Sequence, residues 1–399
     1  MGIVIIGTGI TRFGELWDKN WEELVIDAVS EALKNANIEL KDVFSCYIGN
    51  MNLSRFEGQD HIVARVNEIL GIKKVVRTEA ACASSSVALK LAFDEIQLAS
   101  LKEENKISLV IGFEKMTDRL TENVTEILAS ASHFDTEVLN GATFPGLYAM
   151  IATRYLHETP AEENDLHAIA IKNHKNALLN EKAMFKKEIN LNDFKVDVAF
   201  PLKLFDCSPI SDGAAALILT TEKYAKMLGI DYIRIEDIEF ANSTISLAKR
   251  KDLIVLDAAK KACEKVYEKI KIKPKDLDLI EVHDCFTIAE ILCLEAIGIA
   301  NKKEGYKIVR SLKPYEEINK RDAPIPYLID GKKFYVNTSG GLKAKGHPVG
   351  ATGVAQVVEI VNQLLERCGK RNVKAKIGAT LNIGGSGGSA TFSILKRPW

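Results

Sequence analysis

The second half of the sequence repeats a pattern found in the first half. Residues 38–42 (Ile-Glu-Leu-Lys-Asp) and residues 272–276 (Ile-Lys-Pro-Lys-Asp) each follow an amphipathic helical stretch and precede an apolar run, and the same offset aligns Asn50 with Asp284. A repeat of this kind predicts two similarly folded halves that pack against each other. The chain has 399 residues, which is long enough for two such halves.

Short apolar runs alternate with amphipathic stretches along the first half, which is typical of α/β proteins. The predicted strands are residues 3–6, 44–48, 75–78 and 108–112, and the predicted helices are residues 22–35, 62–70 and 84–99. A polar, lysine-rich segment then interrupts the pattern, which predicts an inserted lobe. We therefore expect an N-terminal half over residues 1–116 and 200–232, an inserted loop domain over residues 117–199, and a C-terminal half over residues 233–399.

Charge and hydropathy exclude several classes of function. The formal net charge is −1 and the sequence pI is about 6.7, so we expect no nucleic acid partner. The chain has no run of about 18 apolar residues, no cationic leader and no peroxisomal tripeptide, so we expect a cytoplasmic protein that does not bind membranes. The seven cysteines are widely spaced, which favours free thiols over disulfides.

Cys82 is the first candidate for a catalytic residue. It lies among small residues where a predicted strand ends and a predicted helix begins. Backbone N–H groups and the helix dipole at such a place favour a thiolate, so we expect a lowered pKa for this thiol. Small neighbours also leave space for an acyl group beside backbone N–H groups. A buried cysteine with only a structural role is the alternative.

His347 is the second candidate. Gly346 precedes it and Pro348 follows it, just before a predicted helix, so the imidazole has a fixed direction. A fixed imidazole is suited to deprotonating a thiol near neutral pH, although an ordinary loop histidine is the alternative. Lys343 and Lys345 in the same segment are expected to reach phosphate groups of a ligand, unless they are merely solvated.

His283 and Cys285 form a third candidate, in the sequence His-Asp-Cys-Phe that follows an apolar run. Residues two apart on a strand share a face, so both side chains point into one pocket if the strand continues through Cys285. A zinc site is a weak alternative, because no Cys-x-x-Cys pair accompanies these residues, and we expect no metal. The end of a purely structural strand is a further alternative.

A glycine-rich segment over residues 381–390 is the fourth candidate. Its adjacent glycines, Gly384 and Gly385, allow the backbone to approach a ligand closely and to direct N–H groups at it, although a flexible turn has the same composition. The glycine patterns of dinucleotide-binding and phosphate-binding loops are incomplete in this chain. Nicotinamide and ATP chemistry are therefore not supported.

Together the four segments resemble the thiolase family in order and spacing across nearly the whole chain. Residues 112–116 and 206–219 also look like segments of that family. The resemblance implies the thiolase fold, in which two βαβαβαββ halves stack in a five-layer αβαβα arrangement and a loop domain is inserted in the first half. It also implies a homodimer or tetramer.

The same resemblance implies a role for each candidate residue. Cys82 is the nucleophile that carries an acetyl group, and His347 is the base that activates it. His283 and His347 form one oxyanion hole, and the N–H groups of Cys82 and Gly384 form the other, with Gly385 beside them as a substrate-binding residue.

One position departs from the family. Many thiolases carry a second catalytic cysteine in a Cys-x-Gly sequence, and this chain has Asn382 at that position. In the sterol-carrier-protein-like branch, and in archaeal relatives that this chain resembles more closely, the cysteine of His-Asp-Cys-Phe takes this role. The resemblance therefore implies that Cys285 is the second acid/base and leaves Asn382 as a substrate-binding residue.

The resemblance implies an acetyl-CoA C-acetyltransferase, which joins two molecules of acetyl-CoA in a Claisen condensation to give acetoacetyl-CoA and CoA. Such an enzyme uses CoA thioesters as substrates without a bound cofactor and supplies the mevalonate pathway to isoprenoids. Archaeal relatives further imply a complex with hydroxymethylglutaryl-CoA synthase and a zinc-binding OB-fold scaffold protein. A degradative 3-ketoacyl-CoA thiolase for longer chains and a non-catalytic acyl-CoA-binding or scaffold protein stay open as alternatives.

Overall fold

Within residues 2–399, which the computed structural model describes, eleven strands form one sheet and two further short strands pair with each other. The strands are β1 (Ile3–Ile10), β2 (Ser45–Gly49), β3 (Val75–Thr78), β4 (Ser108–Glu114), β5 (Asp197–Ala199), β6 (Leu202–Lys203), β7 (Gly213–Thr221), β8 (Ile233–Asn242), β9 (Leu279–Val282), β10 (Tyr327–Ile329), β11 (Lys332–Val336), β12 (Ile377–Gly384) and β13 (Ser389–Lys396). Their order in the large sheet is β10-β11-β9-β12-β13-β8-β1-β7-β4-β2-β3.

The strand order shows two halves with the same topology. The N-terminal half has the order β3-β2-β4-β7-β1, and the C-terminal half has the order β11-β9-β12-β13-β8. In both halves the first two pairings are parallel and the last two are antiparallel. Strands β1 and β8 join the halves through residues 3–5 and 233–235. The repeat in the sequence is therefore a repeat in the fold, as predicted.

The helices follow the same repeat. They are α1 (Trp21–Ala36), α2 (Leu53–Glu57), α3 (Ile62–Leu70), α4 (Ser84–Leu101), α5 (Thr121–Ala129), α6 (Phe144–Glu158), α7 (Glu163–Ala177), α8 (Glu222–Leu228), α9 (Asp257–Lys269), α10 (Thr287–Ile297), α11 (Gly305–Val309), α12 (Gly341–Lys345) and α13 (Thr352–Leu364). Helices α1 and α9 follow the first strand of their halves, and α4 and α13 follow the third. None of these helices within residues 2–399 is long and apolar enough to cross a membrane.

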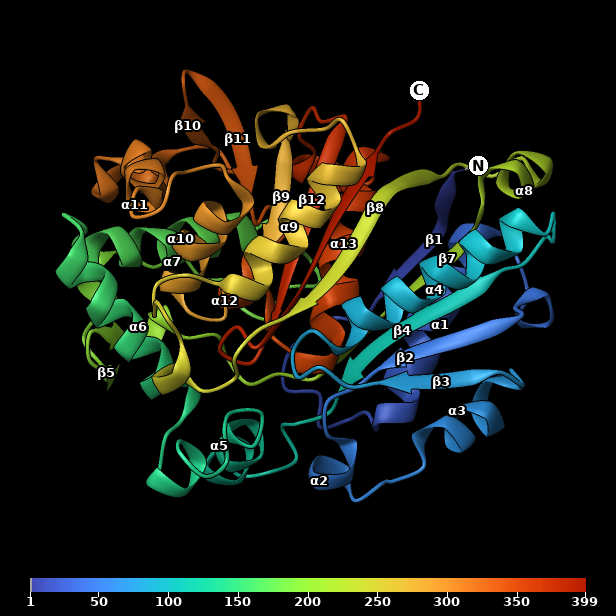
Figure 1. Cartoon of the computed structure of the whole chain (residues 1–399), viewed down its shortest axis with the longest axis horizontal. Helices are drawn as coiled ribbons and strands as arrows, with labels where there is room; N and C mark the ends of the chain where they lie inside the picture. Colours follow the sequence, from blue (N-terminus) through green and yellow to red (C-terminus); the bar gives the residue numbers. More distant parts are fainter. Residues whose placement is uncertain (1) are drawn as a thin grey trace.

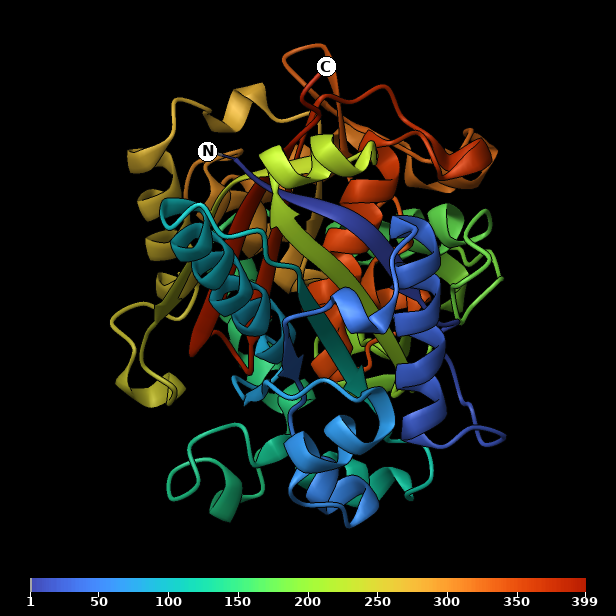
Figure 2. The ribbon, with the colours of Figure 1, turned by 90° about the vertical axis from the view of Figure 1, so that its right-hand side faces the viewer.

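Helices and strands alternate in five layers. Helix α1 packs on the outer face of the N-terminal half, α9 packs on the outer face of the C-terminal half, and α4 and α13 lie between the halves. Val4 and Ile6 point toward α1, whereas Ile3 and Ile5 point toward the central helices, because side chains alternate along a strand. Figure 1 shows α9 against the C-terminal strands, and Figure 2 shows α1 and α4 on opposite sides of the N-terminal strands. The predicted αβαβα arrangement is confirmed.

The segment between β4 and β7 carries α5, α6 and α7, and α6 and α7 pack against α10 of the C-terminal half (Figure 1). Ile169 of α7 and Ile291 of α10 belong to one hydrophobic cluster. Although α7 is polar in sequence, its Lys172 and Asn173 are fully buried. The polar groups of Lys172 and Asn173 therefore form hydrogen bonds inside the protein rather than with water. The domain boundaries given above stay a prediction.

Candidate active site

A cavity of about 250 Å³ lies where the inserted segment meets both halves. Cys82, Cys285, His347 and Gly385 all line this cavity. The rest of its wall is largely apolar and includes Met51, Met116, Leu128, Phe144, Tyr148, Ile210, Phe286 and Val349. An apolar wall suits an acyl chain, and it keeps water away from the reacting atoms.

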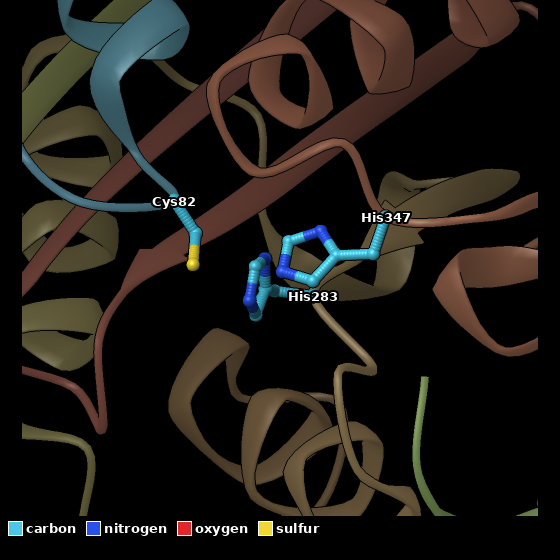
Figure 3. A group of neighbouring side chains, drawn as sticks. All are labelled: Cys82, His283 and His347. Atoms are coloured by element: carbon cyan, nitrogen blue, oxygen red, sulfur yellow. The ribbon is translucent and has the colours of Figure 1, made fainter. Parts of the chain in front are cut away.

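A tight turn between β3 and α4 presents Cys82 to the cavity. Ala81 has a φ of 52°, in the left-handed region that residues with a side chain rarely adopt. The Ala83 N–H donates to the Ala80 carbonyl (3.0 Å), and the Ser84 N–H donates to the Ala81 carbonyl (3.1 Å). This turn directs the thiol of Cys82 toward two imidazoles (Figure 3).

Burial raises the pKa of the Cys82 thiol to about 12. The backbone N–H groups of Gly385 and of Cys82 itself face the sulfur and lower this pKa, but by less than the loss of water raises it. The expectation of a lowered pKa at the start of α4 is therefore wrong, because desolvation outweighs the helix dipole. The thiol is neutral at rest, so its reactivity depends on a nearby base.

The adjacent residues Gly384 and Gly385 have different places relative to Cys82. Gly384 ends β12, where a Cβ atom would lie 2.3 Å from the Ala80 carbonyl oxygen, so glycine allows the strand to pass close to the Cys82 turn. Gly385 has a φ of 59°, and its N–H group is the one that faces the sulfur. The structure thus brings Gly385, rather than Gly384, to the position of a donor.

The surroundings of His347 determine which ring nitrogen carries the proton. Nδ1 lies 2.7 Å from the Thr352 hydroxyl, and that hydroxyl donates its proton to the Pro348 carbonyl (3.0 Å). The hydroxyl therefore accepts from Nδ1–H, which leaves Nε2 with a free lone pair. Burial, followed by the charges of His283, Lys343 and Lys345, lowers the pKa of His347 well below its usual value. His347 is thus a neutral imidazole with Nε2 available as a base.

His283 has the opposite tautomer. The amide nitrogen of Asn382 lies 3.1 Å from His283 Nδ1, and an amide nitrogen can only donate, so Asn382 is the donor of that pair. Nδ1 therefore accepts, and Nε2 carries the proton. His283 Nε2 is buried and has no hydrogen-bond partner within the described part of the chain. Burial lowers the pKa of His283 to about 3, so this group is a neutral N–H donor.

The two imidazoles and the thiol meet at one point (Figure 3). The Cys82 sulfur and one nitrogen of each ring lie within 4.8 Å of one another, and the His283 and His347 rings are 5.0 Å apart at an interplanar angle of 81°. Three such groups also match the ligand number of a catalytic zinc site. However, a protonated Nε2 on His283 cannot bind a metal, because ligation needs a free lone pair. The tautomers instead suit a nucleophile with one base and one donor.

Cys285 reaches the cavity in a different way from the one predicted. Strand β9 ends at Val282, and the Asp284 N–H donates to the Val282 carbonyl (3.1 Å), so the chain turns before Cys285. The expected strand face shared with His283 is therefore absent at this point. Burial raises the pKa of the Cys285 thiol, and the Tyr148 hydroxyl and the Lys343 ammonium partly offset this increase.

Lys343 and Lys345, which were expected to reach phosphate groups of a ligand or to be solvated, are buried away from the catalytic cavity, so the solvated alternative is wrong. Their exposed fractions are 1% and 2%, and neither lines the cavity with Cys82. Lys343 Nζ donates to the carbonyl oxygens of Asp206 and Cys285 (3.0 Å to the latter). These lysines are buried because α12 packs against α7 of the inserted segment, which the sequence pattern of the loop alone does not show.

Asp284 is a contributor that sequence reasoning did not single out. Its Oδ1 accepts from the Leu342 N–H (2.7 Å), and its Oδ2 accepts from Asn173 Nδ2 (2.8 Å). Asn173 Nδ2 also donates to Glu290 Oε2 (3.1 Å). This network ties the segment that carries His283 and Cys285 to α7 and α12. The polar residues of α7, a helix that is otherwise rich in alanine and isoleucine, were the signal that could have revealed it.

Known proteins are similar to this chain over its whole length. The family model described as "Thiolase, N-terminal domain" matches residues 3–200, and the model described as "Thiolase C-terminal domain-like" matches residues 240–397. An acetyl-CoA acetyltransferase of Methanothermobacter thermautotrophicus is 38% identical, over 99% of both chains. An acetyl-CoA acetyltransferase of Methanocaldococcus jannaschii is 40% identical, over 98% of both chains.

A solved structure is also similar to this chain. The Ltp2–ChsH2(DUF35) aldolase structure matches with a TM-score of 0.80 and 18% identity, over 99% of this chain and 98% of the other. At this identity the match shows the fold alone. Since the two family models and both relatives cover nearly the entire sequence, the chain belongs to the thiolase family.

Proposed function

We propose that this protein is an acetyl-CoA acetyltransferase, an acyltransferase that converts two acetyl-CoA into acetoacetyl-CoA and CoA. The observation that carries the proposal is the meeting of the Cys82 sulfur with ring nitrogens of His283 and His347 within 4.8 Å, at the wall of an apolar cavity. The archaeal acetyl-CoA acetyltransferases that share 38–40% of their residues with this chain support the choice of substrate.

In the first half-reaction the thiol of Cys82 loses its proton to His347 Nε2 and attacks the carbonyl carbon of acetyl-CoA. The oxyanion accepts hydrogen bonds from the N–H groups of Cys82 and Gly385. The carbon–sulfur bond to CoA breaks, and the departing thiolate takes the proton from His347. The acetyl group stays on Cys82 as a thioester, so ping-pong kinetics are expected.

In the second half-reaction Cys285 gives its proton to His347 Nε2, which is neutral again once CoA has left, and the resulting thiolate removes an α-proton from a second acetyl-CoA. The Tyr148 hydroxyl and the Lys343 ammonium stabilise that thiolate. The enolate oxygen accepts from His283 Nε2–H, which has no partner among the described residues. The enolate carbon then attacks the acetyl group, and the Cys82 sulfur leaves and takes the proton from His347, while the α-proton stays on Cys285. Each proton transfer of this type accelerates a reaction about 10²–10⁴-fold.

Three further proposals concern the context of this reaction. Thiol and imidazole chemistry is complete without a cofactor or metal, so CoA serves only as part of substrate and product. The product suits the mevalonate pathway to isoprenoids in the cytoplasm. A homodimer or tetramer and a complex with hydroxymethylglutaryl-CoA synthase and a zinc-binding OB-fold protein are the proposed assemblies. The two components in the name of the Ltp2–ChsH2(DUF35) aldolase support a search for such a partner.

The test follows the absorbance of the acetoacetyl-CoA enolate when purified protein and CoA are added. We expect thiolysis to acetyl-CoA, and a mass increase of one acetyl group on Cys82 when acetyl-CoA is added alone. A higher kcat/KM for a long 3-ketoacyl-CoA than for acetoacetyl-CoA would favour the degradative alternative. Tight binding of CoA esters without turnover of any chain length would leave only the scaffold alternative.

A further inference from the structure

A second cavity, of about 640 Å³, lies away from the catalytic one. It is bounded by residues 178–182 after α7, by the side of α13, and by the loop over residues 367–371. The two cavities share no lining residue. None of the catalytic steps above uses this cavity, so its lining needs an explanation of its own.

Lys345 makes this cavity unusual. Lys345 lines the cavity although it is only 2% exposed, and its Nζ has no hydrogen-bond partner within residues 2–399. Its nearest acidic atom is Glu281 Oε2 at 3.7 Å, which is too far for a hydrogen bond. A buried ammonium group has three donors to satisfy, and leaving them unmade is costly. The geometry therefore leaves an unused donor at the wall of the cavity.

The other charges of the cavity also favour an anion. Arg371 is 8% exposed and uses Nη1 for Glu359 and for the Thr338 carbonyl (3.3 Å). The cationic lining residues are Lys182, Lys345, Arg367, Lys370 and Arg371, and the acidic ones are Glu31, Glu181 and Glu359. Lys182 pairs with Glu31 at 3.3 Å, and Arg371 pairs with Glu359.

With five cationic and three acidic side chains, Glu181 among them, the lining of this cavity keeps a positive balance. Glu281, behind Lys345, has its pKa raised to about 7 by burial, so it neutralises Lys345 only in part near neutral pH. Arg367 lies 3.7 Å from Asp231, a weak pairing at a side-chain exposure of 38%. Lys370 at the rim has no ion pair among the described residues.

We propose that this cavity binds a phosphate-sized oxyanion, whose oxygens accept hydrogen bonds from Lys345 Nζ and from the guanidinium of Arg371. Lys370 and Arg367 at the rim attract the anion and cover it. Charge-assisted hydrogen bonds of this kind are the strong class, and they are stronger where water is excluded. The ligand is either free inorganic phosphate or the phosphate group of a larger metabolite.

The test measures phosphate binding by isothermal titration calorimetry and by thermal shift, at constant ionic strength maintained with chloride. We expect wild-type protein to bind inorganic phosphate saturably, and Lys345→Met to weaken the affinity at least tenfold. Arg367→Ala combined with Lys370→Ala should weaken it severalfold. Lys41→Ala, at an exposed lysine 74% accessible, is the matched control and should change nothing.

Two further arms make the outcome decisive. If phosphate binds in the catalytic cavity instead, CoA should displace it, and Lys345→Met should bind it as tightly as wild type does. Either result would overturn the proposal. Equal effects of phosphate and chloride would also overturn it. If Lys345→Met does not fold, the rim double variant carries the test, because its exposed side chains are not part of the core. Displacement of phosphate by a phosphorylated metabolite, with CoA lacking effect, would identify the larger source.

Discussion

The two halves of the molecule share a strand order but contribute differently to the site. In the N-terminal half, residues 79–83 connect the third strand to α4 and carry Cys82. In the C-terminal half the equivalent connection runs over residues 337–351, includes α12, and carries His347. The duplicated framework therefore places two helix starts together, and the unequal loops before those starts supply the proposed nucleophile on one side and the proposed base on the other.

The start of α4 and the start of α13 touch each other directly. The Val354 N–H donates to Ser85 Oγ (3.1 Å), and a Cβ atom on Gly353 would lie 2.7 Å from the Ser86 Cβ atom. Because both helices lie in the central layer, each half directs one helix start at the same point. The position of the proposed catalytic site at the junction of the two halves is thus a consequence of the fold, and the residue types in the loops determine its proposed chemistry.

The equivalent positions Asn50 and Asp284 show the same division. Asn50 Nδ2 donates to Glu114 Oε1 (2.9 Å) within its own half. Asp284 accepts instead from Asn173 of the inserted segment (2.8 Å). Asn50 thus forms a hydrogen bond within its own half, whereas Asp284, at the equivalent position, forms a hydrogen bond with the segment that is inserted between β4 and β7.

The largest effect is expected at Cys82. Cys82→Ala removes the proposed nucleophile, so thiolysis of acetoacetyl-CoA should fall by about 10⁴-fold or more. Small residues surround this position, so the melting temperature should stay close to that of wild type. Activity within tenfold of wild type would show that the N-terminal half does not supply the nucleophile.

Cys285→Ala should separate the two half-reactions. The condensation rate should fall by about 10²–10⁴-fold, because one proton transfer is lost. Mass spectrometry should still detect an acetyl group on Cys82, since that step uses His347. Cys207→Ala is the matched control, because Cys207 lines the same cavity without a catalytic role and should retain activity. Loss of the acetyl group in Cys285→Ala would contradict the division of labour between the two cysteines.

A smaller effect is expected at Asn382, which acts through His283. Asn382→Ala removes the donor to His283 Nδ1 and allows the ring to change its tautomer. Removal of one oxyanion donor costs about 10²–10³-fold in kcat, so loss of a group that only orients the donor should cost about tenfold. Steady-state kinetics should show a lower kcat with little change in KM, and His283→Asn, which keeps an N–H donor, should retain more activity than His283→Ala. Equal kcat values for Asn382→Ala and wild type would contradict the tautomer argued above.

Periodicity and the repeat were sufficient to predict the framework. The predicted helix over residues 62–70 coincides with α3, and the strand over residues 75–78 coincides with β3, because both depend on local patterns. The segments of the proposed site were also singled out from the sequence, since glycine, proline and small residues at strand-to-helix turns have few other uses, and the structure brings Cys82, His283 and His347 together.

Quantities that depend on long-range packing could not be predicted. The pKa of Cys82 depends on its enclosure by α5 and α6 residues far along the chain, and the burial of Lys343 depends on α7. The role of Asn382 depends on its contact with Ser86 in the other half. Local sequence determines which groups are present, but the fold determines which of them lose their water and which become neighbours.

The smallest effect concerns the pH dependence of stability in the C-terminal half. The pKa of His283 is about 3 in the folded state and about 6.5 when unfolded, so between these values the unfolded state binds the additional proton. His283 therefore reduces the free energy of unfolding as pH falls below about 6.5, by about 1.4 kcal/mol per pH unit. Glu114 and Asp284, with pKa values raised to about 7 and 6, act in the opposite direction, so the wild-type profile alone does not isolate His283. In His283→Asn this loss is absent, and the variant should gain stability relative to wild type by that amount per unit in urea unfolding between about pH 6.5 and pH 4.5. A constant difference across this range would mean that His283 is not held neutral, and that its tautomer does not define the donor side of the site.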